Sequence, residues 1–146
     1  MDANTKRIMH IRVKNTIKNL EANNMKAVYV ETKEEALTLV KSIVEKGAYT
    51  ATGGSMTLRE CGIYQYLETE TDLHTDAREA YGASYFLLSA NAITEHGEIF
   101  QVDGRSNRVS AMLFGPEKVI VVAGINKLVP SMRDAAVRVK NTAAPI

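Results

Sequence analysis

The apolar and polar positions along the chain alternate between helical spacing and short β-branched runs. Over the first twenty residues, basic and apolar side chains recur at the spacing of an amphipathic helix. We interpret the Lys and Arg side chains there as a solvated face, with contact to RNA or a membrane as the alternative. Four apolar runs predict strands, at residues 25–31, 48–52, 84–89 and 118–123.

Helices are predicted between these strands from apolar spacing and turn residues. Thr32 and Glu35 form a capping-box pattern, in which Thr32 accepts from the amide of Glu35 and Glu35 reaches back to the amide of Thr32. We expect this helix to end at Gly47, because glycine adopts a left-handed cap at little steric cost. Further helices are expected at 56–67, 75–82, 107–114 and 131–140, and a hairpin at 91–103 that turns at His96 and Gly97.

Strands that alternate with helices indicate right-handed βαβ crossovers. The predicted fold is therefore α/β, with a mainly parallel sheet and helices on both faces. Residues 85–88 and 119–122 are continuously apolar, and we expect both to be interior strands covered on both faces. Ligands of such sheets bind at the carboxyl ends of the strands, which selects the turns at 53–57, 89–91 and 124–127.

The turn formed by Gly53, Gly54 and Ser55 is the first candidate for chemistry. Its glycines allow close approach to the backbone, and the amides of the following helix favour an anion such as phosphate or carboxylate. The turn lacks the third glycine of a dinucleotide fingerprint and the Gly-Lys-Ser/Thr sequence of a P-loop. The alternative is that Ser55 only caps the helix while the glycines make a tight turn, and spacing favours neither interpretation.

Polar residues at other strand exits and helix starts can complete such a site. Arg108 could hold an anion through two hydrogen bonds and Lys127 could offer a point charge, although a lone cation is more often a solvated side chain. Asp103 or Glu95 could act as a base if it were buried. We interpret Cys61 as core packing, because it lies inside a predicted helix, away from the amides that would stabilise a thiolate.

Composition narrows the class of protein. The 146 residues are 45% hydrophobic and 24% charged with a net charge of +1, which fits one globular domain over residues 1–146. A single cysteine excludes a disulfide scaffold, and with only three separated histidines we expect no metal, iron–sulfur cluster or other cofactor. The near-neutral charge argues against nucleic acid as a partner. Without a long apolar run or a signal-peptide core, we expect no membrane contact and a cytoplasmic protein.

Four motifs follow one another in the chain: GGSM, SANAIT, DG-x-x-NR and VVAG-x-NK. They lie within longer segments, TGGSMTLRECGI at 52–63 and LLSANAITEHGEIFQVDGRSNRVSAMLFGPEKVIVVAGINKLV at 87–129, and VKNTAAP follows at 139–145. In these segments the chain resembles the LUD domain, the lactate-utilisation protein family. The resemblance covers nearly the whole chain and implies a fold like that of ribose-5-phosphate isomerase and CoA-transferase proteins.

The resemblance also implies a link to lactate utilisation in bacterial-type metabolism, the oxidation of lactate to pyruvate by complexes with iron–sulfur proteins. The expected role is binding of a small anionic metabolite, and whether the domain is itself an enzyme is open. One alternative is a non-catalytic partner subunit of an iron–sulfur lactate-oxidising complex. Another is an enzyme similar to CoA transferases or sugar-phosphate isomerases, which rests on fold likeness alone. The oligomeric state, including a homo-oligomer, is also open.

The residues expected to bind the ligand are those that match the four motifs: Gly53, Gly54, Ser55, Thr57, Ser89, Asn91, Asp103, Asn107, Arg108, Gly124, Asn126 and Lys127. Two departures from the family are visible. The link between Ile63 and Ala83 is shorter than usual, which affects any substrate contact made there. The chain also stops at Ile146, where longer relatives continue into a segment that can carry cysteines, and we expect it to lack that extension.

Overall fold

A computed structural model describes residues 2–143 and divides the chain into two compact units. Unit 1 combines Met1–Tyr29, Ala90–Gln101 and Gly124–Ile146, and unit 2 combines Val30–Ser89 and Val102–Ala123. Each unit is therefore assembled from stretches that are separated in the sequence. The last segment of the family resemblance, 139–145, lies partly outside the described residues, as does the chain end at Ile146.

The central feature of unit 2 is a parallel sheet of four strands. These are β1 (Tyr49–Thr52), β2 (Asp72–His74), β3 (Tyr85–Leu88) and β6 (Lys118–Val121), in the order β2-β1-β3-β6. Thr50 of β1 lies opposite Tyr85 of β3, and Tyr85 lies opposite Lys118 of β6. The predicted α/β fold with a mainly parallel sheet is confirmed.

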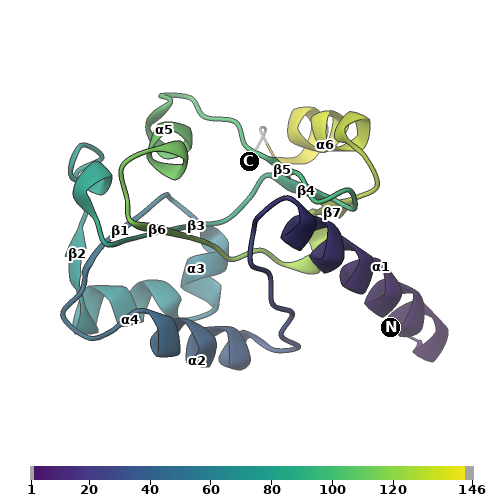
Figure 1. Cartoon of the computed structure of the whole chain (residues 1–146), viewed down its shortest axis with the longest axis horizontal. Helices are drawn as coiled ribbons and strands as arrows, with labels where there is room; N and C mark the ends of the chain where they lie inside the picture. Colours follow the sequence, from purple (N-terminus) through teal and green to yellow (C-terminus); the bar gives the residue numbers. More distant parts are fainter. Residues whose placement is uncertain (1, 144–146) are drawn as a thin grey trace. The chain divides into compact units, whose positions relative to one another are not determined.

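Helices cover both faces of this sheet (Figure 1). On one face lie α2 (Lys33–Ile43), α3 (Met56–Glu60) and α4 (Ile63–Glu70), which pack with Leu87 in one apolar core. On the other face, η1 (Glu79–Gly82) and α5 (Asn107–Leu113) pack against Phe86 and Leu88. The buried side chains of β3 thus alternate between the two cores, as the pleat of a strand requires.

The strand predicted over 25–31 is wrong. Residues 25–30 form no regular structure, and the side chains of Val28 and Tyr29 are 59% and 39% exposed. An apolar run becomes a strand only when a sheet edge supplies its hydrogen-bond partners. This run instead carries the chain from unit 1 into unit 2.

The start of α2 follows the predicted capping box with one change of partner. Thr32 Oγ1 accepts from the amide of Glu35 at 3.1 Å, as expected, but the Glu35 carboxylate accepts from the amide of Glu31 at 2.9 Å rather than from that of Thr32. The end of α2 differs from the prediction, because the helix stops at Ile43 and Val44 is already extended. Gly47 has the left-handed φ of 81° but lies in the turn beyond.

The helix predicted at 56–67 is two helices. Gly62 adopts a φ of 74° and separates α3 from α4, so the chain changes direction where apolar spacing alone suggested continuity. Cys61 caps the end of α3 and packs against the core. Burial raises the pKa of its thiol, which keeps it protonated and agrees with packing rather than nucleophilic chemistry.

Three further elements differ from the sequence prediction. Strand β2 was not expected, and the helix expected at 75–82 is only the short 3₁₀ helix η1. Strand β6 is an edge strand, so the prediction that 119–122 is interior is wrong. These residues nevertheless pack against both cores, Ile120 and Val122 on one side and Val119 and Val121 on the other. A continuously apolar run therefore indicates a strand with both faces packed against other elements, and an edge strand can also be packed in this way.

Unit 1 contains a three-stranded sheet with helices. Its elements are α1 (Ala3–Ala22), β4 (Ala92–Thr94), β5 (Ile99–Phe100), η2 (Ile125–Lys127), β7 (Leu128–Val129), α6 (Met132–Arg138) and a π-type turn, η3 (Val139–Ala143). The predicted hairpin is confirmed as the antiparallel pair β4–β5, and β7, which was not predicted, adds to β4 in parallel. The helix predicted at 131–140 is confirmed as α6.

Helix α1 is held against the turn of this hairpin. Asn19 Nδ2 donates to the carbonyl of Glu95 at 2.7 Å, and Arg12 Nε lies 3.0 Å from Glu95 Oε1. Gly97 in the turn has a φ of 83°, and a Cβ there would lie 2.5 Å from the Asn19 carbonyl carbon. The predicted helix is confirmed, but its amphipathic pattern is only partly realised: Ile8 and Ile11 are 53% and 52% exposed, and Arg12 is paired with Glu95 rather than solvated. Among residues 2–143, no helix is long and apolar enough to cross a membrane.

Candidate functional site

A cleft of about 490 Å³ opens in unit 2 where β1 and β2 end. It lies at the carboxyl ends of parallel strands, where α/β sheets place their ligands. The loop after β2 forms one wall, and the segment before α5 forms another. The lining residues are Ala51, Thr52, Gly53, Gly54, His74, Thr75, Asp76, Ala77, Ala80, Phe86, Val102, Asp103, Gly104, Asn107 and Arg108.

Two glycines without side chains, Gly53 and Gly54, follow β1 and line this cleft. The amide of Gly53 donates to the carbonyl of Leu87 at 3.0 Å, which continues the pairing of β1 with β3. A Cβ at Gly53 would lie 2.6 Å from Arg108 Cδ, so only glycine leaves room for that side chain. A Cβ added at Gly54 would have no atom of the described residues within 4 Å, apart from its chain neighbours, so this position opens onto free space.

Arg108, which lies against Gly53, forms an ion pair with Asp103 at the edge of the cleft. Arg108 Nε lies 3.2 Å from Asp103 Oδ1, and Nη2 donates to the carbonyl of Val102 at 2.9 Å. Asp103 Oδ2 accepts from the amide of Val109 at 2.6 Å and so caps the first turn of α5. The two side chains are only 20% and 9% exposed. The pair therefore has a fixed position, which a charge used for recognition requires.

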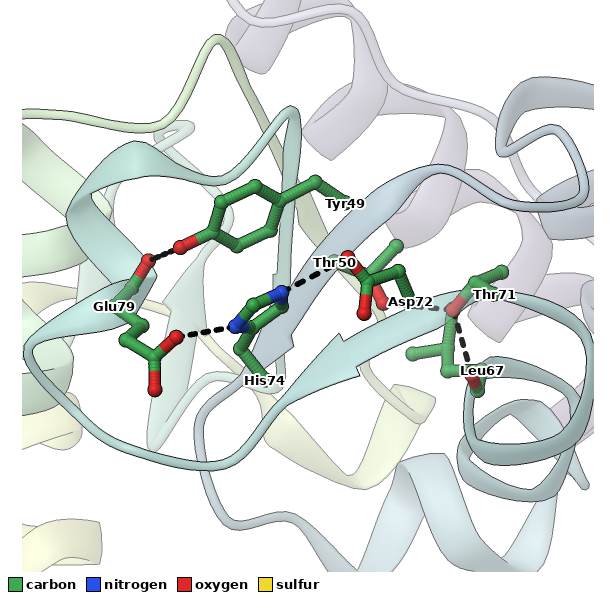
Figure 2. Close-up of polar contacts among 7 residues, drawn as sticks. All are labelled: Tyr49, Thr50, Leu67, Thr71, Asp72, His74 and Glu79. Atoms are coloured by element: carbon green, nitrogen blue, oxygen red, sulfur yellow. Dashed lines mark hydrogen bonds and ion pairs between the residues drawn. The ribbon is translucent and has the colours of Figure 1, made fainter.

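His74 lies at the end of β2 between two carboxylates (Figure 2). Its Nε2 is 3.0 Å from Asp72 Oδ2, and its Nδ1 is 2.5 Å from Glu79 Oε2. The ring of Tyr49 stacks on the imidazole with centroids 4.0 Å apart, and the Tyr49 hydroxyl donates to the carbonyl of Glu79. The hydrogen bonds to Asp72 and Glu79 raise the pKa of His74 above its usual range.

A hydroxyl pair supports β2 next to this histidine. Thr50 is fully buried in β1, and its Oγ1 lies 2.8 Å from Thr71 Oγ1. Thr71 Oγ1 also donates to the carbonyl of Leu67 at 2.6 Å, so its single hydrogen is used there and Thr50 is the donor between the two hydroxyls. Figure 2 shows this chain of bonds running from Thr50 of β1 through Thr71, between α4 and β2, to Leu67 of α4.

Five residues of the predicted binding set line the cleft together: Gly53, Gly54, Asp103, Asn107 and Arg108. Ser55 and Thr57 instead form the start of α3: Ser55 precedes the helix as its N-cap, with Oγ accepting from the amide of Leu58 at 3.2 Å, and Thr57 lies in its first turn. Because α3 has five residues, its dipole is weaker than that of the longer helix expected from the sequence. Ser89 is buried directly after β3, with 6% exposure.

The other predicted residues belong to unit 1. The amide of Asn91 donates to Gln101 Oε1 at 3.3 Å within the hairpin. Gly124, Asn126 and Lys127 share one tight turn, in which the amide of Lys127 donates to the carbonyl of Gly124 at 3.0 Å. A Cβ at Gly124 would lie 2.6 Å from Asn126 Oδ1, so the glycine accommodates that side chain. Glu95, considered as a base, pairs with Arg12.

The cluster of Asp72, His74, Glu79 and Tyr49 was not predicted from the sequence. The available signal was the spacing of Asp72 and His74, because residues two apart lie on the same side of a strand. That signal requires β2 to be recognised first. Among residues 2–143, no group of three or more His, Cys, Asp or Glu side chains is arranged to hold a metal ion. The two carboxylates here contact opposite nitrogens of His74 and do not converge on one point.

These observations define the class: an α/β protein with a parallel sheet and a polar cleft at the carboxyl ends of its strands. The family model for the LUD domain matches residues 13–146. The chain belongs to the LUD domain family. No curated protein and no solved structure matches the chain.

Proposed function

We propose that this LUD-domain protein acts in lactate utilisation by binding a small anionic metabolite in the cleft of unit 2. The observation that carries the proposal is the fixed guanidinium of Arg108, which lines the same cleft as the open backbone at Gly54. Guanidinium groups suit carboxylates and phosphates, which they bind through paired hydrogen bonds. The fold likeness to ribose-5-phosphate isomerase and CoA-transferase proteins is part of the same proposal, since ligands of such folds lie at the strand ends.

The net charge of the lining favours a ligand of low charge. Asp103 offsets Arg108, Asp72 and Glu79 flank His74, and Asp76 adds a further carboxylate to the lining, so the cleft offers cationic groups without a large positive field. A monocarboxylate such as lactate or pyruvate fits this balance better than a polyphosphate, which needs a concentrated positive charge. A cleft of about 490 Å³ also has room for a ligand larger than lactate.

The test is calorimetric titration of the protein with lactate, pyruvate, inorganic phosphate, a sugar phosphate and CoA. The discriminating variant is Gly54→Ala, which adds a methyl group to a residue that lines the cleft, at a position with no other described residue within 4 Å apart from its chain neighbours. We expect at least one carboxylate to bind and Gly54→Ala to weaken it about tenfold or more, because the methyl group occupies ligand space. A matched control is Ser42→Ala on α2, away from the lining of this cleft.

Binding of none of these probes to the parent protein, or equal affinity in Gly54→Ala, contradicts the proposal. The alternative is then the non-catalytic partner subunit of an iron–sulfur lactate-oxidising complex. Leu113 and Phe114 favour this second role, because they are adjacent, apolar, and 77% and 84% exposed at the end of α5. Gel filtration with the iron–sulfur proteins of such a complex tests it, and Phe114→Ser should abolish co-elution if the pair is the contact.

A further inference from the structure

The loop after β2 forms a wall of the cleft, and it is bracketed by His74 and Glu79. Thr75, Asp76 and Ala77 all line the cleft. Inside the loop, Asp76 Oδ1 accepts from the amide of Arg78 at 2.9 Å, and the Asp76 carbonyl accepts from the amide of Glu79 at 3.0 Å. These bonds shape the loop locally but do not attach it to the sheet. Glu79 attaches the end of the loop to His74 of β2 and Tyr49 of β1, and the next residue, Ala80, packs against the sheet.

The geometry at His74 suits a doubly protonated ring. Each ring nitrogen faces a carboxylate oxygen, at 3.0 Å for Asp72 and 2.5 Å for Glu79. An ionised carboxylate has no hydrogen to donate, so both hydrogens must come from the imidazole. A neutral imidazole has one N–H and would turn a nitrogen lone pair towards the second carboxylate. The arrangement therefore describes an imidazolium that joins β2 to the start of η1.

We propose that His74 is a positioning residue of the cleft: its imidazolium fastens the wall at 75–78 to the sheet, and deprotonation loosens this wall and weakens binding of the anionic metabolite. The part of this inference that concerns binding of the metabolite rests on the proposed function. The state of the wall does not depend on that function and can be measured without a ligand.

The charged groups around the ring set the direction of the effect. Asp72 from β2 and Glu79 from η1 act on it directly, and Tyr49 from β1 stacks on it as a neutral phenol whose pKa is raised by burial. Helix α4, which packs against β2, ends in Glu70, and Glu70 lies 3.9 Å from Lys46. Asp76, Asp103 and Arg108 line the same cleft.

The sign of the pH dependence follows from these contacts. The pKa of His74 is raised in the folded protein. The stability that its contacts with Asp72 and Glu79 contribute is therefore fully present below the pKa of an unfolded histidine, about 6.5. It is lost as pH rises through the higher folded value. We therefore expect the wall to loosen as the pH rises through the raised pKa of folded His74, and to keep its attachment below about pH 6.5.

The experiment combines NMR titration of the histidine ring with amide exchange over residues 75–80, corrected for intrinsic pH dependence. In the parent protein, exchange in the wall should rise about three- to tenfold across the titration of His74, the change expected for loss of one charge-assisted, partly exposed hydrogen bond. His74→Gln should exchange at the fast limit at every pH. His96→Gln, on the hairpin turn of unit 1, is the matched control and should behave like the parent.

Glu79→Gln gives a second variant that keeps the ring and removes one charge. Its amide can still accept from Nδ1, but it stabilises the imidazolium less, so the midpoint of the His74 titration should fall. Wall protection that stays constant through the His74 titration, protection in His74→Gln equal to that of the parent, or an unchanged midpoint in Glu79→Gln each overturns the proposal.

Binding is then measured by calorimetry with lactate and with sulfate, whose charges do not change across this pH range. Affinity in the parent should fall with the same midpoint as wall protection, and it should be pH-independent in His74→Gln. If the wall loosens while affinity stays constant, the link between His74 and binding is overturned. If neither anion binds at any pH, the proposed function fails, and the exchange measurement alone decides the role of His74 in holding the wall.

Discussion

The aliphatic stem of Arg108 passes directly over the α-carbon of Gly53. A Cβ at Gly53 would lie 2.6 Å from Arg108 Cδ, 2.7 Å from Arg108 Cγ and 3.2 Å from Leu88 Cβ. The first of two adjacent glycines is therefore needed for packing of the cleft wall, whereas the second is open. A motif that looks uniform in the sequence has two different physical roles.

Gly53→Ala should destabilise the fold, and Gly54→Ala should not. The new methyl group at Gly53 displaces Arg108 from Asp103, which we expect to cost about 1–3 kcal/mol. The substitution at Gly54 should stay within about 0.5 kcal/mol of the parent. Urea unfolding of both variants measures the difference, and equal midpoints for the two would contradict the packing described for Gly53.

Thr50→Val should cost about 1 kcal/mol, since it removes a buried hydroxyl that donates to Thr71 while keeping the shape of the side chain. Thr69→Val is the matched control, because the Thr69 hydroxyl bonds its own helix at an exposed site. Chemical denaturation compares the two. A control as destabilised as Thr50→Val would show that loss of a hydroxyl bond costs as much at an exposed site, so that burial of the Thr50–Thr71 pair adds nothing.

The contact between Tyr85 and Glu45 should appear in the acid dependence of stability. The Tyr85 hydroxyl donates to Glu45 Oε2 at 2.7 Å, and this bond lowers the pKa of Glu45. A lowered carboxyl pKa adds stability above the unfolded value that is lost as pH falls through the folded one. Tyr85→Phe should therefore lose less stability than the parent between about pH 5 and about pH 3. Unfolding midpoints that fall in parallel would exclude the contact as the cause.

Gly97→Ala should detach α1 from the hairpin. Gly47→Ala is the control that separates backbone strain from steric clash as causes of the lost stability. Both glycines have left-handed φ angles, 83° and 81°, but only Gly97 is crowded, by the backbone of Asn19 and Leu20. The strain alone costs about 1 kcal/mol at Gly47, and the clash should add at least about 2 kcal/mol at Gly97. Denaturation and proteolysis within α1 test this; an equal loss in both variants would mean that α1 does not need the close approach.

The elements that sequence could predict are those whose own residues determine them. Strand β3 is apolar at every position, and the hairpin has Gly97 at its turn, so local pattern was sufficient for both. Strand β2 was not predicted, because its three residues gain their conformation from pairing with β1. Only Leu73 among them is apolar, and it lies between Asp72 and His74. The run at 25–31 has strand composition but no such neighbour. Pairing is a tertiary property, which a short window of sequence does not contain.

The candidate site was predictable to a similar extent. Gly53 and Arg108 were selected because they follow a strand and begin a helix, and the fold places them in contact. The contact between His74 and Glu79 could not be predicted from the sequence, because Glu79 reaches the ring through a turn that follows the unpredicted strand β2. Residues 124–127 were selected by the same strand-exit rule, yet they belong to the other unit, because the rule contains no information on how the chain divides into units.

The chain passes from one unit to the other four times, after residues 29, 89, 101 and 123. During synthesis from the ribosome, the first three strands of the large sheet emerge before the hairpin of unit 1, but β6 emerges only after it. The sheet of unit 2 therefore lacks its last strand, β6, until after the hairpin of unit 1 has been synthesised. No continuous fragment of the gene encodes one whole unit without a segment of the other, so expressing either alone requires splicing its separate segments together.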